Sequence, residues 1–249
     1  MFKKITFALL ITGTVTFQNC KTPDEDDPAP LPITAPVVTF PSAVKNVDGV
    51  LAAIITVTKD NGTELKVGSA YAAFYKSKNP ANKVEAGTVT INSKSTTKSD
   101  DNAYFYAASA GEPNGLVYQS QVFWKATGST TNDVPSINDN DGSGLPNVPT
   151  VPEFINMNAS QDKLISWTSS FGADSVVFIL KGTSGTYSKV FNNTVTSHTI
   201  PMAEIAKVGM GSATLQIINY KLQIRAVGTK NYAFLKQCIG ICSKIGITP

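Results

Sequence analysis

The sequence has very few residues of the kinds that recognise negatively charged ligands. Its only arginine is Arg225, and its only histidine is His198. Charged residues make up 16% of the chain, below the ~25% of an ordinary soluble protein. The formal net charge is +3, and Lys3 and Lys4 supply two of those charges. This composition argues against a nucleic-acid-binding surface and against arginine clamps for phosphate or carboxylate groups.

The sequence also lacks the residue patterns of common catalytic centres. His198 lies in a Thr/Ser-rich run and has neither a G-x-S-x-G elbow nor a cysteine nucleophile to accompany it. No phosphate-binding loop or dinucleotide fingerprint is found. We therefore expect a protein that is not an enzyme and that needs no cofactor. A carboxylate-dependent glycoside hydrolase stays open as an alternative, because its two acids need to meet only in space.

Cysteine is equally scarce. The three cysteines are Cys20, Cys238 and Cys242, and the last two are separated by Ile-Gly-Ile. Such close spacing predicts either a small disulfide-closed loop in an oxidising compartment or a pair of reduced thiols. A zinc site is not expected, since no histidine or further cysteine lies nearby in the sequence.

The N-terminus has the three parts of an export signal. Lys3 and Lys4 precede an uncharged apolar stretch over residues 5–17, and Cys20 follows. The stretch is too short for a membrane-spanning helix, which needs ~20 apolar residues. We therefore expect residues 1–19 to be a signal peptide.

The residues around Cys20 resemble those of a bacterial lipoprotein. Phe17-Gln18-Asn19-Cys20 is similar to a lipobox, although Phe17 and Asn19 replace the small residues that are usual there. Four acids follow at residues 24–27, flanked by prolines. Together these features resemble the surface lipoproteins of the Bacteroidota. The resemblance implies a lipid on Cys20, a tether over residues 20–35, and an outer-membrane location, either at the cell surface or on the periplasmic face.

Short apolar runs separated by turn signals dominate residues 36–127, which we expect to form a β-sandwich-like domain. Asn61-Gly62 between two such runs predicts a hairpin turn. Aromatic residues recur at strand spacing, and they form either an exposed platform for a ligand such as a glycan or part of the core. These candidate ligand-binding residues are Tyr71, Tyr75, Tyr104, Tyr106, Tyr118 and Trp124.

Residues 128–152 are rich in Gly, Ser, Asn, Asp and Pro, which predicts a linker between domains. Within them, Asp139 and Asp141 precede a glycine, as in the first half of a calcium-binding loop. Thr150 stands where an EF-hand needs its glutamate, so calcium is a weak alternative to a solvated linker, and we expect no metal.

Residues 153–249 contain seven short strand-like runs, and residues 201–208 predict a helical turn. The run 164–168 contains Trp167 and resembles the B strand of fibronectin type III domains, while residues 220–227 resemble their F strand. The resemblance implies an immunoglobulin-like β-sandwich. The expected fold class is therefore all-β, with two β-sandwich (Ig/fibronectin III-like) domains in tandem after a lipoprotein signal peptide.

These expectations favour a lipid-anchored, non-catalytic binding or adhesion module for a glycan, a peptide or a protein. A structural or accessory subunit of an outer-membrane complex is the main alternative. The expected contacts are a membrane, through the lipid, and a glycan or protein ligand, but no nucleic acid. The sequence does not fix the oligomeric state.

Overall fold

The computed structural model describes residues 44–119, 121–168 and 172–249. Within these residues, β-strands predominate and the largest sheet has ten strands. Its order is β13-β12-β15-β16-β1-β2-β7-β6, with β10 beside β16 and β3 beside β2. These strands are β1 Gly49–Asp60, β2 Thr63–Tyr75, β3 Lys83–Val84, β6 Thr97–Lys98, β7 Tyr104–Tyr106, β10 Phe154–Asn158, β12 Ser175–Lys181, β13 Thr186–Asn192, β15 Gly211–Val227 and β16 Lys230–Thr248.

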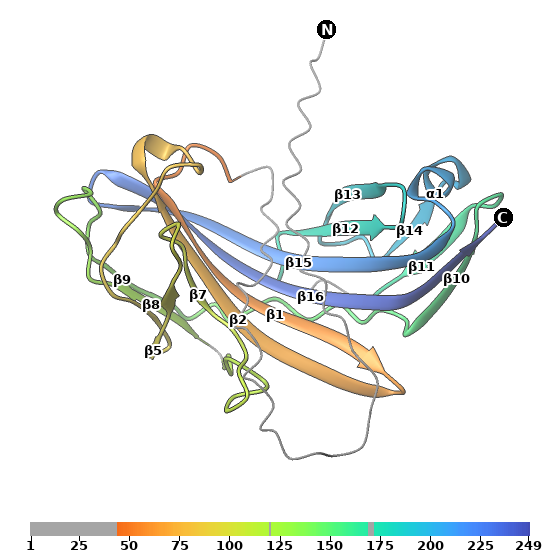
Figure 1. Ribbon diagram of the computed structural model, residues 1–249, viewed down its shortest axis with the longest axis horizontal. Coiled ribbons are helices and arrows are strands. Elements are labelled where there is room, and N and C mark those ends of the chain that lie inside the picture. The colour runs from red at the N-terminus through yellow and green to blue at the C-terminus, as the bar shows by residue number, and fades with distance from the viewer. Residues whose placement is uncertain (1–43, 120, 169–171) are drawn as a thin grey trace, which may run out of the picture.

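Two smaller sheets accompany this central sheet. The first has the order β5-β4-β8-β9, and the second pairs β11 with β14. Their strands are β4 Val89–Ile91, β5 Lys94–Ser95, β8 Val122–Ala126, β9 Ile137–Asp141, β11 Lys163–Ser166 and β14 Ser197–Ile200. A short 3₁₀ turn, η1 (Lys76–Lys78), and one α-helix, α1 (Met202–Val208), complete the described elements. Figure 1 shows the small sheets near opposite ends of the long strands.

Local sequence explains several of these elements. Asn61 and Gly62 both adopt positive φ, at 50° and 77°, and join β1 to β2. Such a turn fits the right-handed twist of the paired strands, so the predicted hairpin is confirmed. Pro201 precedes α1 and Gly209 follows it, at a φ of 96°. The predicted helical turn is therefore confirmed as well.

The longest hairpin is formed by β15 and β16, and its strands contribute to both ends of the molecule. β16 pairs with β15 on one side and in parallel with β1 on the other, where Gly49 lies opposite Tyr232 and Thr58 opposite Ile241. Strands from residues 36–127 and from residues 153–249 therefore belong to one continuous sheet (Figure 1). The expected boundary between the two ranges does not separate two sheets.

Two apolar cores lie on the same side of the central sheet, which we call its inner face. The first core packs Leu51 and Phe74 of the central sheet against Trp124 of the four-stranded sheet. The second packs Phe178 and Leu215 of the central sheet against β11, β14 and α1. Each end of the protein is thus a two-layer arrangement of sheets, and the expected all-β sandwich fold class is confirmed.

Residues 128–152 differ from the expected linker. They contain β9, which pairs with β8 along its full length. Beyond β9, Leu145 and Val148 pack against Cys238 on the inner face, and Val151 belongs to the second core. The Asn219 side chain donates a hydrogen bond of 2.7 Å to the Asn147 carbonyl. The apolar side chains of this segment pack into the clusters on the inner face of the sheet, so the segment is part of the folded structure.

Candidate functional site

The predicted lipidation residue, Cys20, and the acidic tether lie outside the described residues. The signal peptide over residues 1–19 lies outside them too. Their assignment therefore stays a prediction from the sequence.

The candidate aromatic residues do not form one exposed platform. Tyr104 and Trp124 are each 2% exposed in the first core, and Tyr104 meets Phe74 edge to face at 5.9 Å between ring centroids. Tyr75 is buried on the opposite, outer face of the sheet. Because these rings fill cores on both faces, the platform interpretation is wrong for them.

The other three candidates are partly buried and also lie apart. The Tyr118 hydroxyl donates to the Ser69 carbonyl, and burial raises the pKa of Tyr118 well above its usual range. The Tyr106 hydroxyl donates to the Glu112 carboxylate. Tyr71 packs at the edge of the outer-face clusters, and burial followed by the charge of Asp101 raises its pKa to about 12.

Of the two alternatives for Cys238 and Cys242, the structure shows the pair of reduced thiols and not the disulfide. Both cysteines are free and buried, and both lie in β16. Four residues along a strand span ~13 Å, whereas bridged Cα atoms lie roughly 4.4–6.8 Å apart. Gly240 does not bend the chain between them. Instead it lets the Pro149 carbonyl approach, since a Cβ at this position would lie 2.4 Å from that oxygen.

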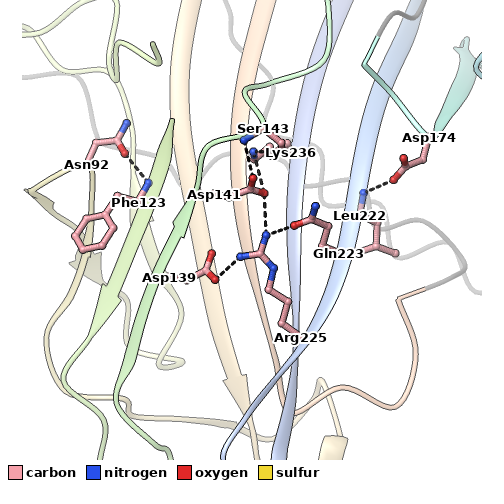
Figure 2. Close-up of polar contacts among 10 residues, drawn as sticks. All are labelled: Asn92, Phe123, Asp139, Asp141, Ser143, Asp174, Leu222, Gln223, Arg225 and Lys236. Carbon is pink, nitrogen blue, oxygen red and sulfur yellow. Dashed lines mark hydrogen bonds and ion pairs between the residues drawn. The ribbon is translucent and has the colours of Figure 1, made fainter. Parts of the chain in front are cut away.

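Asp139 and Asp141 lie in a network of charges between two layers. Arg225 contacts both carboxylates, at 3.2 Å for Asp141, and also the Gln223 side chain. The Lys236 ammonium lies 2.9 Å from Asp141 and its side chain is only 5% exposed. Figure 2 shows these side chains pointing toward one another between β9 and the β15–β16 hairpin.

The network determines the ionisation of its members. Burial alone would raise the pKa of Asp141, but hydrogen bonds from Ser143 and the pairing with Lys236 lower it to about 2. Burial lowers the pKa of Lys236, and the adjacent Asp141 opposes that shift. The pair is thus held charged in a protected position, where it joins β9 to β16.

This pairing bears directly on the weak calcium candidate. The carboxylates of Asp139 and Asp141 contact cationic side chains of the same chain. Across the described ranges, no group of three or more Asp, Glu, His or Cys residues is placed to hold a metal ion. One oxygen of Asp139 is buried without a hydrogen-bond partner in the described part of the chain. The arrangement is a structural link between layers.

The single histidine is engaged in packing. The His198 ring stacks on Tyr187 at 5.9 Å between centroids, and its Nε2 lies 2.7 Å from the Tyr187 hydroxyl. Phe191 and Phe178 contact the same ring at 4.9 and 5.7 Å. Burial, followed by the charge of Lys189, lowers the pKa of His198. This ring joins β13 to β14 within an aromatic cluster.

A shallow groove lies beside the tip of the β1–β2 hairpin. It has a volume of about 500 Å³ and is open to solvent along its length. A smaller hollow of about 110 Å³ adjoins it, sharing Lys59, Thr150 and Val151. The groove is lined by Lys59, Gly62, Thr150, Val151, Pro152, Glu153, Ser166, Trp167 and Thr168. We call this surface the hairpin groove.

Glu153 fixes one wall of the hairpin groove. Its carboxylate accepts hydrogen bonds from the backbone N–H groups of Asn61, at 2.7 Å, and Gly62, at 3.0 Å. Lys244 lies 3.2 Å away and also pairs with Asp60. The pKa of Glu153 is lowered, and the hydrogen bond from the Gly62 N–H has the largest effect. Glu153 therefore stays ionised and holds the hairpin tip against residues 150–153.

Trp167 forms part of the opposite wall. The residue is 6% exposed, and its ring contacts Phe178 and Phe191 at 6.1 and 5.9 Å between centroids. Its indole Nε1 is buried and has no hydrogen-bond partner within the described ranges. Ser166 and Thr168 on either side of it are exposed. The groove thus combines a buried aromatic wall with polar groups at its rim.

The sequence does not reveal Glu153, Trp167 and Lys59 as a set. The resemblance to fibronectin type III domains places Trp167 in a B strand, and no sequence pattern singles out Glu153 or Lys59. The three residues come together because β1 and residues 150–153 both lie against the second half of the sheet. A local pattern cannot reveal such a meeting, since the residues are up to 108 positions apart in the sequence.

No known protein family matches this chain, and neither does any curated protein.

Proposed function

We propose that this protein is a lipid-anchored, non-catalytic binding module of a bacterial cell envelope, with the hairpin groove as its ligand-binding surface. The observation that carries the proposal is the groove itself, which is lined by Trp167, a residue whose buried indole N–H lacks an acceptor among the described residues. Buried donors are normally satisfied, so the indole N–H is the group of this wall that most favours an acceptor atom on a ligand.

The shape of the groove favours an extended ligand. Sites for small molecules are usually enclosed and cover most of their ligand. The hairpin groove is open, and its lining offers the exposed hydroxyl groups of Ser166 and Thr168 and the half-buried Lys59 side chain. Such a surface suits a stretch of glycan or peptide that passes through it and is held by hydrogen bonds.

The strand order in the second half supports a binding scaffold of the immunoglobulin and fibronectin type III kind. In immunoglobulin sandwiches, strands C, F and G form one sheet and strands B and E lie in the other. Here β12, β15 and β16 are neighbours in the central sheet, and β11 pairs with β14 in the second sheet. Scaffolds of this kind hold ligands on loops and edges while the core stays unchanged.

The membrane attachment rests on the sequence around Cys20. None of the described helices is long and apolar enough to cross a bilayer. A lipid on Cys20, followed by the acidic tether, would hold the folded part at the outer membrane and display it at the cell surface. Stable attachment needs more than one acyl chain, which a triacylated cysteine provides.

Glycan and peptide arrays test the binding proposal. The chain lacking residues 1–20 is expected to bind one class of extended ligand. Ser166→Arg should abolish that binding because a long cation would fill the groove from its rim. Ser188→Arg introduces the same side chain at an exposed position of β13, outside the groove, and should bind normally. Binding that survives Ser166→Arg unchanged would show that the ligand lies elsewhere.

Membrane fractionation tests the anchor. In a bacterial host, Cys20→Ala should leave the protein soluble or uncleaved, whereas Thr22→Ala should leave it in the membrane fraction. If Cys20→Ala stays attached to the membrane as fully as the parent, the lipid anchor is refuted.

A further inference from the structure

The β1–β2 hairpin ends in a stretch of β2 that has a neighbouring strand on one side only. All of β2 pairs with β1. On its other side, β7 pairs with residues 70–72, β3 pairs with residues 74–75, and Gly115 forms a bridge to Gly68. Among the described residues nothing pairs with that side of residues 63–67, which we call the open edge. Figure 1 shows the tip of the hairpin reaching beyond β7.

The backbone groups of Glu64 and Lys66 point away from β1. In an antiparallel pair, successive residues alternate between bonding to the partner strand and facing the other way. The Gly68 N–H donates to Asn114 and its carbonyl accepts from Leu116, so the backbone groups of Gly68 face away from β1. Lys66 and Glu64 precede it by two and four residues and face the same way. Within the described ranges their outward backbone groups have no hydrogen-bond partner.

The side chains of the open edge are exposed and carry both signs of charge. Glu64 lies on the inner face, where it lines the smaller hollow together with Lys59. Lys66 lies on the same face, because residues two positions apart on a strand share a face. Leu65 between them lies on the outer face and is 52% exposed. The edge therefore presents one anion, one cation and one large apolar side chain.

We propose that the open edge pairs with the open edge of a second copy of this chain, in an antiparallel ladder centred on Leu65. Two-fold symmetry places Leu65 opposite the second Leu65, and Glu64 opposite Lys66 of the second copy. Thr63 then lies opposite Val67. Because Glu64 and Lys66 both face away from β1, each such pair exchanges two backbone hydrogen bonds. Each pair also brings a carboxylate to an ammonium, while the two leucines meet on the outer face.

The charges select this register. Sliding the second strand by two residues centres the ladder on Glu64 or on Lys66, so that like charges lie directly opposite each other and oppose the pairing. A ladder centred on Lys66 would also need Gly68, whose N–H and carbonyl are already bonded. Sliding by one residue opposes outward groups to groups that are bonded to β1, so no ladder bonds form.

The proposed ladder is short. It ends at Val67 on each strand because Gly115 occupies the edge beside Gly68. The second copy's chain leaves the ladder at that point, since its Asn61-Gly62 turn leads back into β1. Small interfaces give weak or transient association, so covalent capture of the pair is the suitable test.

The pairing would place two hairpin grooves on one face of a continuous sheet, and only this consequence rests on the proposed function. A two-fold axis normal to the sheet keeps both inner faces on the same side. Gly62, which lines the groove, and its counterpart would lie six residues apart along the paired strands, about 20 Å. An extended ligand longer than this reaches both grooves, and the second contact strengthens its binding.

Disulfide trapping tests the pairing in the chain lacking residues 1–20, which keeps every described residue and lacks the thiol of Cys20. Opposed residues that exchange no hydrogen bonds lie ~4.5 Å apart at Cα, which suits a disulfide. Under mild oxidation, Leu65→Cys should form a covalent dimer at least about tenfold faster than Leu164→Cys. Leu164 is the matched control because it is a leucine of β11, 61% exposed and outside the open edge. Equal rates in the two variants overturn the proposal.

A mixture of two variants tests the register. Thr63→Cys on one copy and Val67→Cys on another should crosslink to each other at least about tenfold faster than either does to itself. The reason is that identical positions lie four residues, ~13 Å, apart along the paired strands. Comparable rates for all three products overturn the proposal, because they would show chance collisions or a different register.

A proline tests the backbone hydrogen bonds. Glu64→Pro removes an N–H that faces away from β1, so it should block the ladder and leave the hairpin bonds in place. Added to Leu65→Cys, it should slow crosslinking to the rate of Leu164→Cys, whereas Glu64→Gln keeps the N–H and should slow it less. An unchanged rate with the proline overturns the proposal. These rates need no ligand, so a loss of ligand binding in Ser166→Arg leaves them unaffected and the two proposals fail separately.

Discussion

Replacing Asp141 by asparagine should destabilise the protein more than any comparable change at its surface. The substitution keeps the size of the side chain and removes its charge. Lys236 then remains with its side chain 5% exposed and without its closest counter-ion, which lies 2.9 Å away. Removing one partner of a buried ion pair costs about 3–5 kcal/mol. For a chain of this size, the melting temperature should fall by roughly 6–20 °C.

A double-mutant cycle separates the pair from its surroundings. Lys236→Met leaves Asp141 with the Ser143 N–H at 2.8 Å and with Arg225 at 3.2 Å, so its cost should be smaller. The double variant, Asp141→Asn with Lys236→Met, buries no uncompensated charge. It should be more stable than the sum of the two changes implies, by about 2 kcal/mol.

Denaturant unfolding of the chain lacking residues 1–20 measures these differences, and the two tryptophans report on both cores. Trp124 lies in the first core and Trp167 in the second. Asp133→Asn is the matched control, since Asp133 pairs with Lys230 at 2.7 Å while 85% exposed. An exposed pair contributes only about 0–1 kcal/mol. If Asp141→Asn costs no more than this control, the network does not hold β9 to the central sheet.

Three further outcomes follow from packing and ionisation. Gly240→Ala should cost about 1–3 kcal/mol in thermal melts, because its Cβ would lie 2.4 Å from the Pro149 carbonyl oxygen; an unchanged melting temperature would contradict this. Cys238 and Cys242 should give two titratable thiols after non-reducing unfolding, and none would indicate a disulfide. Burial lowers the pKa of His198, so its contribution to stability is complete above its unfolded pKa of ~6.5 and declines as the pH falls below it. His198→Gln should reduce this loss between pH 7 and pH 5, and an identical pH profile would refute the assignment.

The alternation of residues predicted the strands but not their partners. The hairpin at Asn61-Gly62 and the helical turn after Pro201 depend on local backbone preferences, so the sequence alone reveals them. The parallel pairing of β1 with β16 joins Gly49 to Tyr232, which are 183 residues apart. A period of two assigns each residue to a face, and many strands of the same pattern can serve as neighbours.

The candidate residues show the same limit. The spacing of Cys238 and Cys242 indicated a loop because glycine commonly marks a turn. In the structure, Gly240 continues the strand and admits the Pro149 backbone. The spaced acids Asp139 and Asp141 indicated a solvated linker or calcium. Their cationic partners come from strands about 90 residues later, which no local pattern contains.

The polar residues on the inner face help explain why such long strands adopt one register. A shift of β16 by two residues would keep every apolar side chain on its present face, so alternation alone does not exclude it. That shift would move Lys236 into the position of Phe234, inside the first core and away from Asp141. It would also move Gly240 away from Pro149, where only a glycine fits. The charged network and the glycine therefore oppose slipped pairings at the junction between the cores, where the apolar pattern is least selective.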